Sequence, residues 1–406
     1  MIKTNKRLYF KYFDLFRVSE FYGFEADSLR AQHNMAIIQN NFDVNLVSLH
    51  ISELQILGFD LQTCYEILEF SSSKDINYIT TVLSSVDKWI LNLILPDFFS
   101  LSLLKHIFIS QNIRSKQQLE DYFASSIAAT SFGDEQAELY SYFVMNSDNS
   151  SFPEKYLSRS YSGLLTEVDG KYLYGNYHNH STYSDGRLSI NELRMLAESY
   201  GKSFVGISDH TKRVNGIDED SVLRQHNEID ALNHSDSSCR ILKGVECEIL
   251  PDGSLDFASN ILETFDYVII AAHRDTNMVK SIATNRLIKA IENPSANILA
   301  HPSARLYGKN VGLLLDMHKI IDACVANRVI IEINGDSDRL DLDPKYIDYA
   351  LDKGAIFSLD SDTHIREGYF NINNSIAIAQ DFNIPSSSII NTSPNFNFRS
   401  FKNNYV

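Results

Sequence analysis

Apolar side chains recur at three- and four-residue spacing through the first 145 residues of the chain. The pattern is clear over residues 8–21 and 54–68, where glycine and proline are scarce. This period is typical of α-helices that bury one face. Residues that favour helix N-termini stand at three expected helix starts: Ser52, Asp60 and Ser115. The pattern therefore predicts an all-helical domain over residues 1–145.

The hydrophobic pattern then stops. Residues 146–151 are all polar, and a proline follows at position 153. Such a stretch between two patterned regions is typical of a loop. We expect a linker over residues 146–165.

From residue 166 to residue 406 short apolar runs alternate with helical stretches, which is typical of repeated strand-helix units. Several of the runs are continuously apolar, as expected for parallel strands buried on both faces. The seven runs are Tyr172–His180, Phe204–Ser208, Ile241–Ile249, Tyr267–Ala272, Asn297–Ala300, Val329–Ile333 and Ala355–Leu359. The helices expected beside them include Ile190–Tyr200, Thr284–Ile291, Leu314–Asn327 and Pro344–Lys353. This order predicts an α/β fold, a seven-stranded (β/α) barrel that resembles a TIM barrel with one unit fewer.

Charge and composition narrow the class of protein. The net charge is −16 and the pI is about 5.2, so the bulk charge does not predict non-specific binding to nucleic acid. Four widely spaced cysteines fit reduced, buried thiols better than a disulfide framework. Neither a signal peptide nor a membrane-spanning run is predicted. We expect a cytoplasmic protein that does not bind membranes.

A side chain that can bind metal sits at or just after the end of all seven runs. The carboxyl ends of barrel strands converge on one face, where active sites are built. The candidate ligands, which lie at or just after the end of six of the seven runs, are His178, His180, Asp185, His210, Glu246, His273, His301, Asp362 and His364. The other six of the twelve histidines lie elsewhere, and we expect them to have ordinary surface or capping roles.

Nine candidate ligands are too many for one ion with four to six ligands. They suit two or three divalent ions that share a bridging carboxylate. Clustered ions of this kind bind phosphate oxygens and lower the pKa of a bound water. The sequence therefore predicts a hydrolase that acts on phosphoester bonds.

The motifs also resemble a known family. In chain order they are His-x-His with Asp-Gly, Ser-Asp-His, Gly-Val-Glu, Ala-His, His-Pro and Ser-Asp-Thr-His, and together they are similar to the polymerase and histidinol phosphatase (PHP) family. That family has a distorted seven-stranded barrel and a trinuclear site, usually of zinc, manganese or iron. The resemblance implies one ion on His178, His180, Glu246 and Asp362, a second shared by Glu246 with His273 and His301, and a third on Asp185, His210 and His364.

Within the family, the barrel is most similar to the C-terminal PHP domain of bacterial family X DNA polymerases. Arg305 and Arg339 lie in the matching stretches. Each is a candidate to contact a substrate phosphate, and the alternative is that each forms an ion pair at the barrel rim with Asp341 or Glu332. Asp209 and Glu248 are candidates to orient the ligating imidazoles.

The helical part resembles the small helical domain and the two helix-hairpin-helix elements of the same polymerases, over residues 54–69 and 95–122. Such hairpins use Gly-x-Gly to approach a DNA phosphate. This chain has one glycine, Gly58, in the first hairpin and none in the second. DNA binding by the helical part is therefore not favoured. A catalytic palm does not fit between the two parts, so we expect no polymerase activity.

Three hypotheses follow. The preferred one is a 3′–5′ exonuclease, a DNA-processing phosphodiesterase that acts on DNA 3′ ends. The second is a small-molecule phosphatase of the histidinol-phosphatase type. The third is a non-catalytic binding module whose metal only stabilises the barrel.

Overall fold

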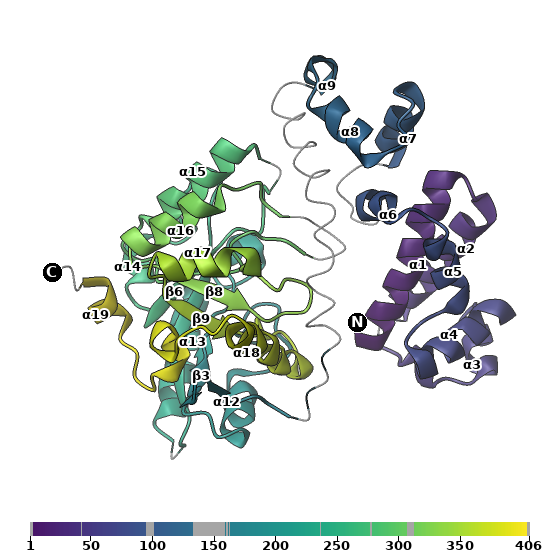
Figure 1. The fold of residues 1–406 in the computed structure, drawn as a ribbon. Coiled ribbons are helices and arrows are strands. Elements are labelled where there is room, and N and C mark those ends of the chain that lie inside the picture. The colour runs from purple at the N-terminus through teal and green to yellow at the C-terminus, as the bar shows by residue number, and fades with distance from the viewer. Residues whose placement is uncertain are drawn as a thin grey trace. The chain divides into compact units, whose positions relative to one another are not determined.

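A computed structural model describes residues 3–41, 43–94, 101–132, 159, 161, 163–235, 237–276, 278–306 and 312–403 (Figure 1). The described residues up to 132 form one compact unit, and those from 159 onward form the other. The predicted linker, residues 146–165, lies largely outside the described residues, so its boundaries stay a prediction. No helix in the described part of the chain is both long and apolar enough to cross a membrane.

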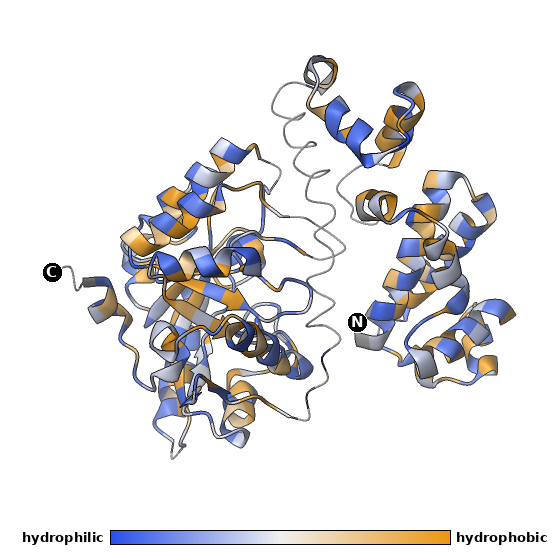
Figure 2. Cartoon of the chain, in the orientation of Figure 1, coloured by the Kyte–Doolittle hydropathy of each residue, from blue (hydrophilic) through white to orange (hydrophobic). Residues whose placement is uncertain are grey.

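The first unit is helical throughout its described residues, as predicted. Its elements are α1 (Lys3–Tyr22), α2 (Glu25–Asn40), η1 (Leu46–Ser48), α3 (Ile51–Ile56), α4 (Leu61–Ser73), α5 (Asn77–Ser84), α6 (Lys88–Ile94), α7 (Leu101–Ser110), α8 (Lys116–Phe123) and α9 (Ser126–Phe132). Leu8, Tyr12 and Leu15 recur along one face of α1 and are fully buried. This spacing places them against α2, and Figure 2 shows apolar and polar residues alternating along these helices.

Two of the three predicted helix starts are confirmed. Asp60 caps α4 by accepting a hydrogen bond from the backbone nitrogen of Thr63 at 2.7 Å, and Ser115 caps α8. The expectation for Ser52 is wrong, because α3 begins one residue before it. His50 is the cap there, and its backbone nitrogen donates to the Glu53 carboxylate at 2.8 Å.

The second unit contains the predicted parallel barrel. Seven strands pair in chain order, each parallel to the next: β3 (Gly175–Asn176), β4 (Phe204–Ile207), β5 (Arg240–Glu248), β6 (Tyr267–Ala271), β7 (Ile298–Leu299), β8 (Ile330–Asn334) and β9 (Phe357–Asp360). All five residues of β6 are buried, as its continuous apolar sequence predicts for a strand covered on both faces. The first predicted run holds two elements, because residue 172 belongs to a separate hairpin of β1 (Glu167–Val168) and β2 (Lys171–Tyr172).

The barrel is nearly closed. Its first and last strands are joined past their ends, where Asn179 and Thr363 form a parallel bridge. The backbone nitrogen of His180 donates to the carbonyl of Thr363 at 2.8 Å, and the nitrogen of Thr363 donates to the carbonyl of His178 at 3.3 Å. This seam places the segment after β3 beside the segment after β9.

Helices surround the sheet (Figure 1). They are α12 (Ile190–Ser199), α13 (Glu219–Asn233), α14 (Ser259–Leu262), α15 (Lys280–Ile291), α16 (Met317–Ala326), α17 (Ile347–Asp352), α18 (Ile372–Asp381) and α19 (Phe398–Asn403), with short 3-10 turns η2 (Lys212–Val214), η3 (Pro344–Tyr346), η4 (Arg366–Asn371), η5 (Ser386–Ser388) and η6 (Ile390–Thr392). The four predicted helices correspond to α12, α15, α16 and η3 with α17. The predicted fold class, a seven-stranded barrel preceded by a helical region, is confirmed.

Candidate metal centre

All nine predicted ligands come together at the carboxyl ends of the barrel strands. They form four overlapping groups whose ligand atoms lie within 4.8 Å of one another. The groups are His178, His180 and Asp362; His178, Glu246 and His301; His210, Glu246 and His273; and His180, Asp185, His210 and His364. The overlap means that one cluster, rather than several separate sites, occupies the barrel mouth.

The first group has the spacing of ligands around one ion. The Nε2 atoms of His178 and His180 lie 3.1 Å apart, and Oδ1 of Asp362 lies 3.4 Å and 3.2 Å from them. An ion with bonds of about 2.1 Å separates adjacent ligand atoms by about 3.0 Å in octahedral geometry and about 3.4 Å in tetrahedral geometry. All three side chains are 3% exposed or less, so water competes little for their lone pairs.

The two oxygens of Glu246 face different imidazoles. Oε1 lies 2.9 Å from Nε2 of His301 and 3.3 Å from Nε2 of His273. Oε2 lies 3.4 Å from Nε2 of His178 and 3.5 Å from Nε2 of His180. A buried carboxylate placed in this way can bind one ion with each oxygen.

Asp185 organises the most exposed group. Its Oδ1 lies 3.3 Å from Nε2 of His364, 3.6 Å from Nε2 of His210 and 4.0 Å from Nδ1 of His180. The Asp185 side chain is 52% exposed and that of His364 is 31% exposed, whereas Glu246 is buried. This side of the cluster therefore meets solvent.

Buried polar atoms without hydrogen-bond partners test whether the cluster fits metal. In the described part of the chain, five such atoms belong to this cluster: His180 Nδ1, His210 Nδ1, Glu246 Oε2, His273 Nε2 and His301 Nδ1. His210 Nδ1 and Glu246 Oε2 lie 2.7 Å apart but lack hydrogen-bond geometry. Buried polar atoms are normally paired, since an unpaired one costs about 1–3 kcal/mol. Divalent cations bound between the facing ligand atoms would give Glu246 Oε2 and His273 Nε2 a partner, so these residues fit a metal cluster.

The histidines of the cluster differ in protonation, because some have a lowered pKa and others a raised one. Burial, together with the nearby Arg339 charge, lowers the pKa of His301 to about 3. Burial would also lower the pKa of His273, but the Glu246 carboxylate opposes it and raises the pKa to about 9. A similar balance, with Asp185 as the opposing carboxylate, raises the pKa of His364 to about 9. Metal binding would require the last two rings to lose their protons.

The Glu248 carboxylate contacts the His273 imidazole, and its expected role in orienting a ligating imidazole stays a prediction. Its Oε2 lies 2.8 Å from Nδ1 of His273, and its two oxygens accept hydrogen bonds from the backbone nitrogens of His273 and Arg274 at 3.0–3.1 Å. A proton kept on Nδ1 leaves Nε2, the atom that faces Glu246, as the metal-binding atom.

Glu332 does the same for His178 and was not among the predicted site residues. Its Oε1 lies 2.6 Å from Nδ1 of His178, and its Oε2 accepts a hydrogen bond from the backbone nitrogen of His301 at 2.7 Å. Burial raises the pKa of Glu332 to about 7, and the neighbouring His178 opposes this rise. The signal was its position on β8, facing the same barrel end as the ligands.

Asp209 has a different role from the one expected. Its carboxylate accepts hydrogen bonds from the backbone nitrogen and hydroxyl of Ser181, at 2.7 and 2.6 Å, and from Ser184 and Gln225. Asp209 and His210 are adjacent on an extended segment, so their side chains point to opposite sides. Asp209 therefore holds the loop that leads to Asp185, and it does not orient the His210 ring.

The two candidate arginines also differ. Arg305 is tied to the loop after β8, through Asp343 at 2.9 Å and the carbonyls of Arg339 and Leu340, so the rim ion pair has Asp343 rather than Asp341 or Glu332 as its partner. Arg339 lies at the cluster, where its Nε donates to Oδ2 of Asp362 at 3.0 Å. Only Arg339 is thus next to the ligands.

No protein-family model matches the chain. The DNA polymerase/3′-5′ exonuclease PolX of Bacillus subtilis is 34% identical over 208 residues, which make up 50% of this chain and 36% of PolX. A probable phosphatase of Caldanaerobacter subterraneus is 29% identical over 163 residues, 38% of this chain and 62% of the phosphatase. A histidinol phosphate phosphatase structure from Lactococcus lactis, complexed with zinc, L-histidinol and phosphate, aligns with a TM-score of 0.39 and 15% identity over 52% of this chain and 93% of that one.

The chain thus spans less than two thirds of the length of either sequence relative. One of them is a polymerase that is also named as an exonuclease, and the other is a probable phosphatase. These relatives confirm the resemblance of the chain to the PHP family that its motifs predict.

Proposed function

We propose that the chain is a metal-dependent phosphoesterase that removes nucleotides from DNA 3′ ends as a 3′–5′ exonuclease, without polymerase activity. The observation that carries the proposal is the Glu246 carboxylate, whose two oxygens face two sets of imidazoles. The relationship to PolX favours DNA as the substrate class. The probable phosphatase relative favours a second candidate, a phosphatase of small phosphomonoesters.

Under this proposal the nine ligands hold two or three ions. His178, His180 and Asp362 would bind one ion together with Oε2 of Glu246. His273 and His301 would bind a second with Oε1 of Glu246, and Asp185, His210 and His364 would bind a third. Ligands that are mostly imidazole favour zinc or iron over magnesium or calcium, and the carboxylates among the nine ligands also suit manganese. Such ions supply positive charge for a phosphoryl group and lower the pKa of a bound water.

The remaining residues of the centre keep the ligands ready. Glu248 and Glu332 hold protons on Nδ1 of His273 and His178. Arg339 offers a planar, permanently charged guanidinium beside Asp362, and this group suits a phosphate oxygen. Because Asp185 is the exposed ligand, substrate would enter from its side of the cluster.

The test measures two activities of the full chain loaded with manganese or zinc. Release of nucleotides from 3′-labelled single-stranded DNA is compared with hydrolysis of p-nitrophenyl phosphate, and bound metal is measured by elemental analysis. His180→Ala and Asp362→Asn should lose both metal and activity. His234→Ala removes an exposed histidine outside the cluster and should change neither.

Hydrolysis of the small ester alone would replace the exonuclease with the second candidate. No hydrolysis of either substrate by metal-loaded protein would reject both and leave a non-catalytic module. Full activity of metal-free Asp362→Asn would reject the assigned site.

A further inference from the structure

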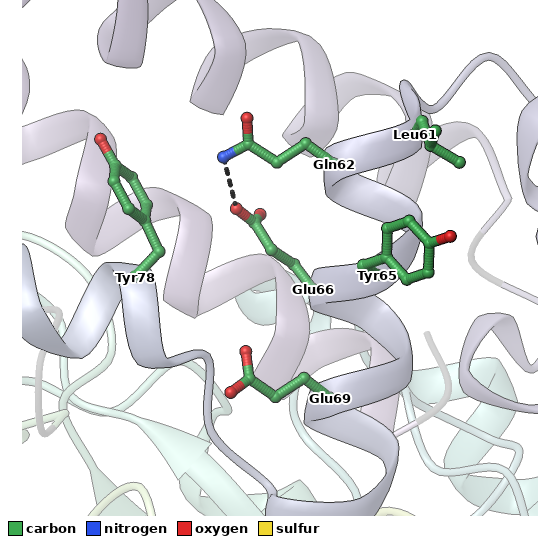
Figure 3. A pocket seen from close by; sticks show the side chains of 6 residues that line it. All are labelled: Leu61, Gln62, Tyr65, Glu66, Glu69 and Tyr78. Carbon is green, nitrogen blue, oxygen red and sulfur yellow. Dashed lines mark hydrogen bonds between the residues drawn. The ribbon is translucent and has the colours of Figure 1, made fainter.

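A groove in the helical unit lies between α4 and α5, on the hairpin where the sequence resembles a DNA-binding element. Its volume is about 760 Å³, and it is lined by Leu61, Gln62, Tyr65, Glu66, Glu69 and Tyr78. Figure 3 shows Gln62, Glu66 and Glu69 of α4 pointing toward Tyr78 of α5, whereas Leu61 and Tyr65 project from another side of α4. The groove thus combines a polar floor with an apolar border.

A helix-hairpin-helix element binds DNA phosphate at the start of its second helix, and in this chain the carboxylate of Asp60 occupies that place. Phosphate would bind the free backbone nitrogens at the start of the second helix. In this chain the Asp60 carboxylate accepts a hydrogen bond from the nitrogen of Thr63 at that position. A phosphate would have to displace this carboxylate and would be repelled by its charge.

The charge of the hairpin reinforces this exclusion. Residues 43–75 contain a single basic side chain, Lys74, against six acidic ones: Asp43, Glu53, Asp60, Glu66, Glu69 and Asp75. The Glu66 carboxylate forms an ion pair with the Arg30 guanidinium at 2.7 Å and accepts further hydrogen bonds from Tyr12 and Gln62. Glu69 has no ion-pair partner among the described residues. Its Oε2 accepts a hydrogen bond from the backbone nitrogen of Asn77 at 3.2 Å, which leaves the carboxylate charged and able to attract a cation that enters the groove.

Apolar side chains on the same helix lack cover from the described residues. Leu61, Tyr65 and Leu68 follow one another at helical spacing and are 51%, 58% and 36% exposed. Ile56, at the end of α3, is 83% exposed. An apolar stripe beside an acidic groove is typical of a surface that binds a protein partner.

We propose that this surface, defined as the groove together with Ile56 and Leu68, binds a basic amphipathic segment of a partner protein. A lysine or arginine of the partner would lie between α4 and α5, where the Glu69 carboxylate attracts a cation. The Tyr78 ring already has the Arg30 guanidinium 5.0 Å from its centroid. Leucine-like side chains of the partner would cover the apolar stripe. The surface would thus recruit the enzyme to a protein rather than to DNA.

The test uses the full chain and a fluorescent 14-residue peptide in which leucine and arginine alternate at helical spacing. A peptide with glutamate in place of arginine and a single-stranded oligonucleotide serve as comparison ligands. Fluorescence anisotropy is recorded at two salt concentrations. We expect saturable binding of the arginine peptide alone, weakened by salt because exposed charges contribute to it.

Variants locate the binding. Glu69→Lys should raise the Kd for the arginine peptide by about tenfold or more, and Leu61→Ser should raise it by about threefold or more. Asp43→Lys makes the same charge change at an exposed position outside the groove and should raise it by less than about twofold. Thermal melting of each variant checks that the helical unit remains folded.

Three results would overturn the proposal. The first is absence of saturable binding by the arginine peptide. The second is an equal effect of Glu69→Lys and Asp43→Lys, which would mean non-specific attraction to an acidic protein. The third is binding of the oligonucleotide, if the arginine peptide displaces it and Glu69→Lys strengthens it, because the surface would then be a nucleic-acid-binding site.

Discussion

Glu248→Gln tests whether a residue that touches no proposed ion controls how tightly an ion is held. The carboxylate is fully buried and accepts hydrogen bonds from the backbone nitrogens of His273 and Arg274, with Nδ1 of His273 2.8 Å from its Oε2. Glutamine has a single acceptor oxygen and no charge, so at least one of these bonds is lost and the imidazole bond is weakened.

The size of the effect follows from the type of bond. A hydrogen bond to a charged group contributes roughly 1.5–3 kcal/mol, and about 1.4 kcal/mol corresponds to a tenfold change in affinity. We therefore expect the ion nearest His273 to bind about 10–100-fold more weakly, the usual range for such outer residues. The unfolding free energy should fall by about 1–3 kcal/mol, because a buried polar contact is also lost.

The assay raises the chelator concentration in steps and measures bound metal per chain. Glu248→Gln should lose one ion at a lower chelator concentration than the others, whereas the wild type should retain it. Glu292→Gln, at an exposed position after α15, is the matched control and should behave as the wild type does. An unchanged chelator profile in Glu248→Gln, with the fold intact, would refute the orienting role of Glu248.

Three further predictions concern pH and stability. The pKa values of His273 and His364 are raised to about 9, so each ring must lose a proton before binding metal. Metal affinity should therefore rise with pH up to about 9, by about tenfold per pH unit for each proton released. Chelator competition at several pH values measures this rise, and an affinity that does not change with pH would contradict the prediction. Phe357→Ala empties a fully buried position on β9 and should cost about 3–5 kcal/mol in denaturant unfolding of the barrel; a loss under about 1 kcal/mol would mean that the core refills. Asp60→Ala removes the cap of α4 and should cost about 0.5–2 kcal/mol in the unfolding of the helical unit, whereas Asp43→Ala, at an exposed loop position, should cost less than about 0.5 kcal/mol.

The barrel could be predicted because its strands are continuous apolar runs and its ligands follow those runs. Glu248 could be placed too, since residues two apart on a strand share a face with period two. The same rule, applied to Asp209 and His210, would have shown that adjacent side chains point apart. Adjacency in sequence was therefore the wrong guide to the role of Asp209.

Other elements carried a weaker signal. Helix α13 buries Gln225 and His226 beside Val222 and Ile229, so a search for apolar periodicity misses it. Glu332 lies on β8 between two buried isoleucines, and nothing local distinguishes a residue that orients an imidazole from a ligand. Its role depends on the spatial position of His178, which comes from the opposite end of the barrel sequence.

The seam between the first and last strands has a consequence for the order of folding. His178 and His180 follow β3, whereas Asp362 and His364 follow β9, and the Asn179–Thr363 bridge holds the two segments together. During synthesis, half of the groups in the cluster therefore remain incomplete until the ribosome has added almost the last part of the barrel. Metal binding would then be a late step that links the first and last strands of the barrel. Loss of the metal should weaken the contact between these two strands before any other strand pair.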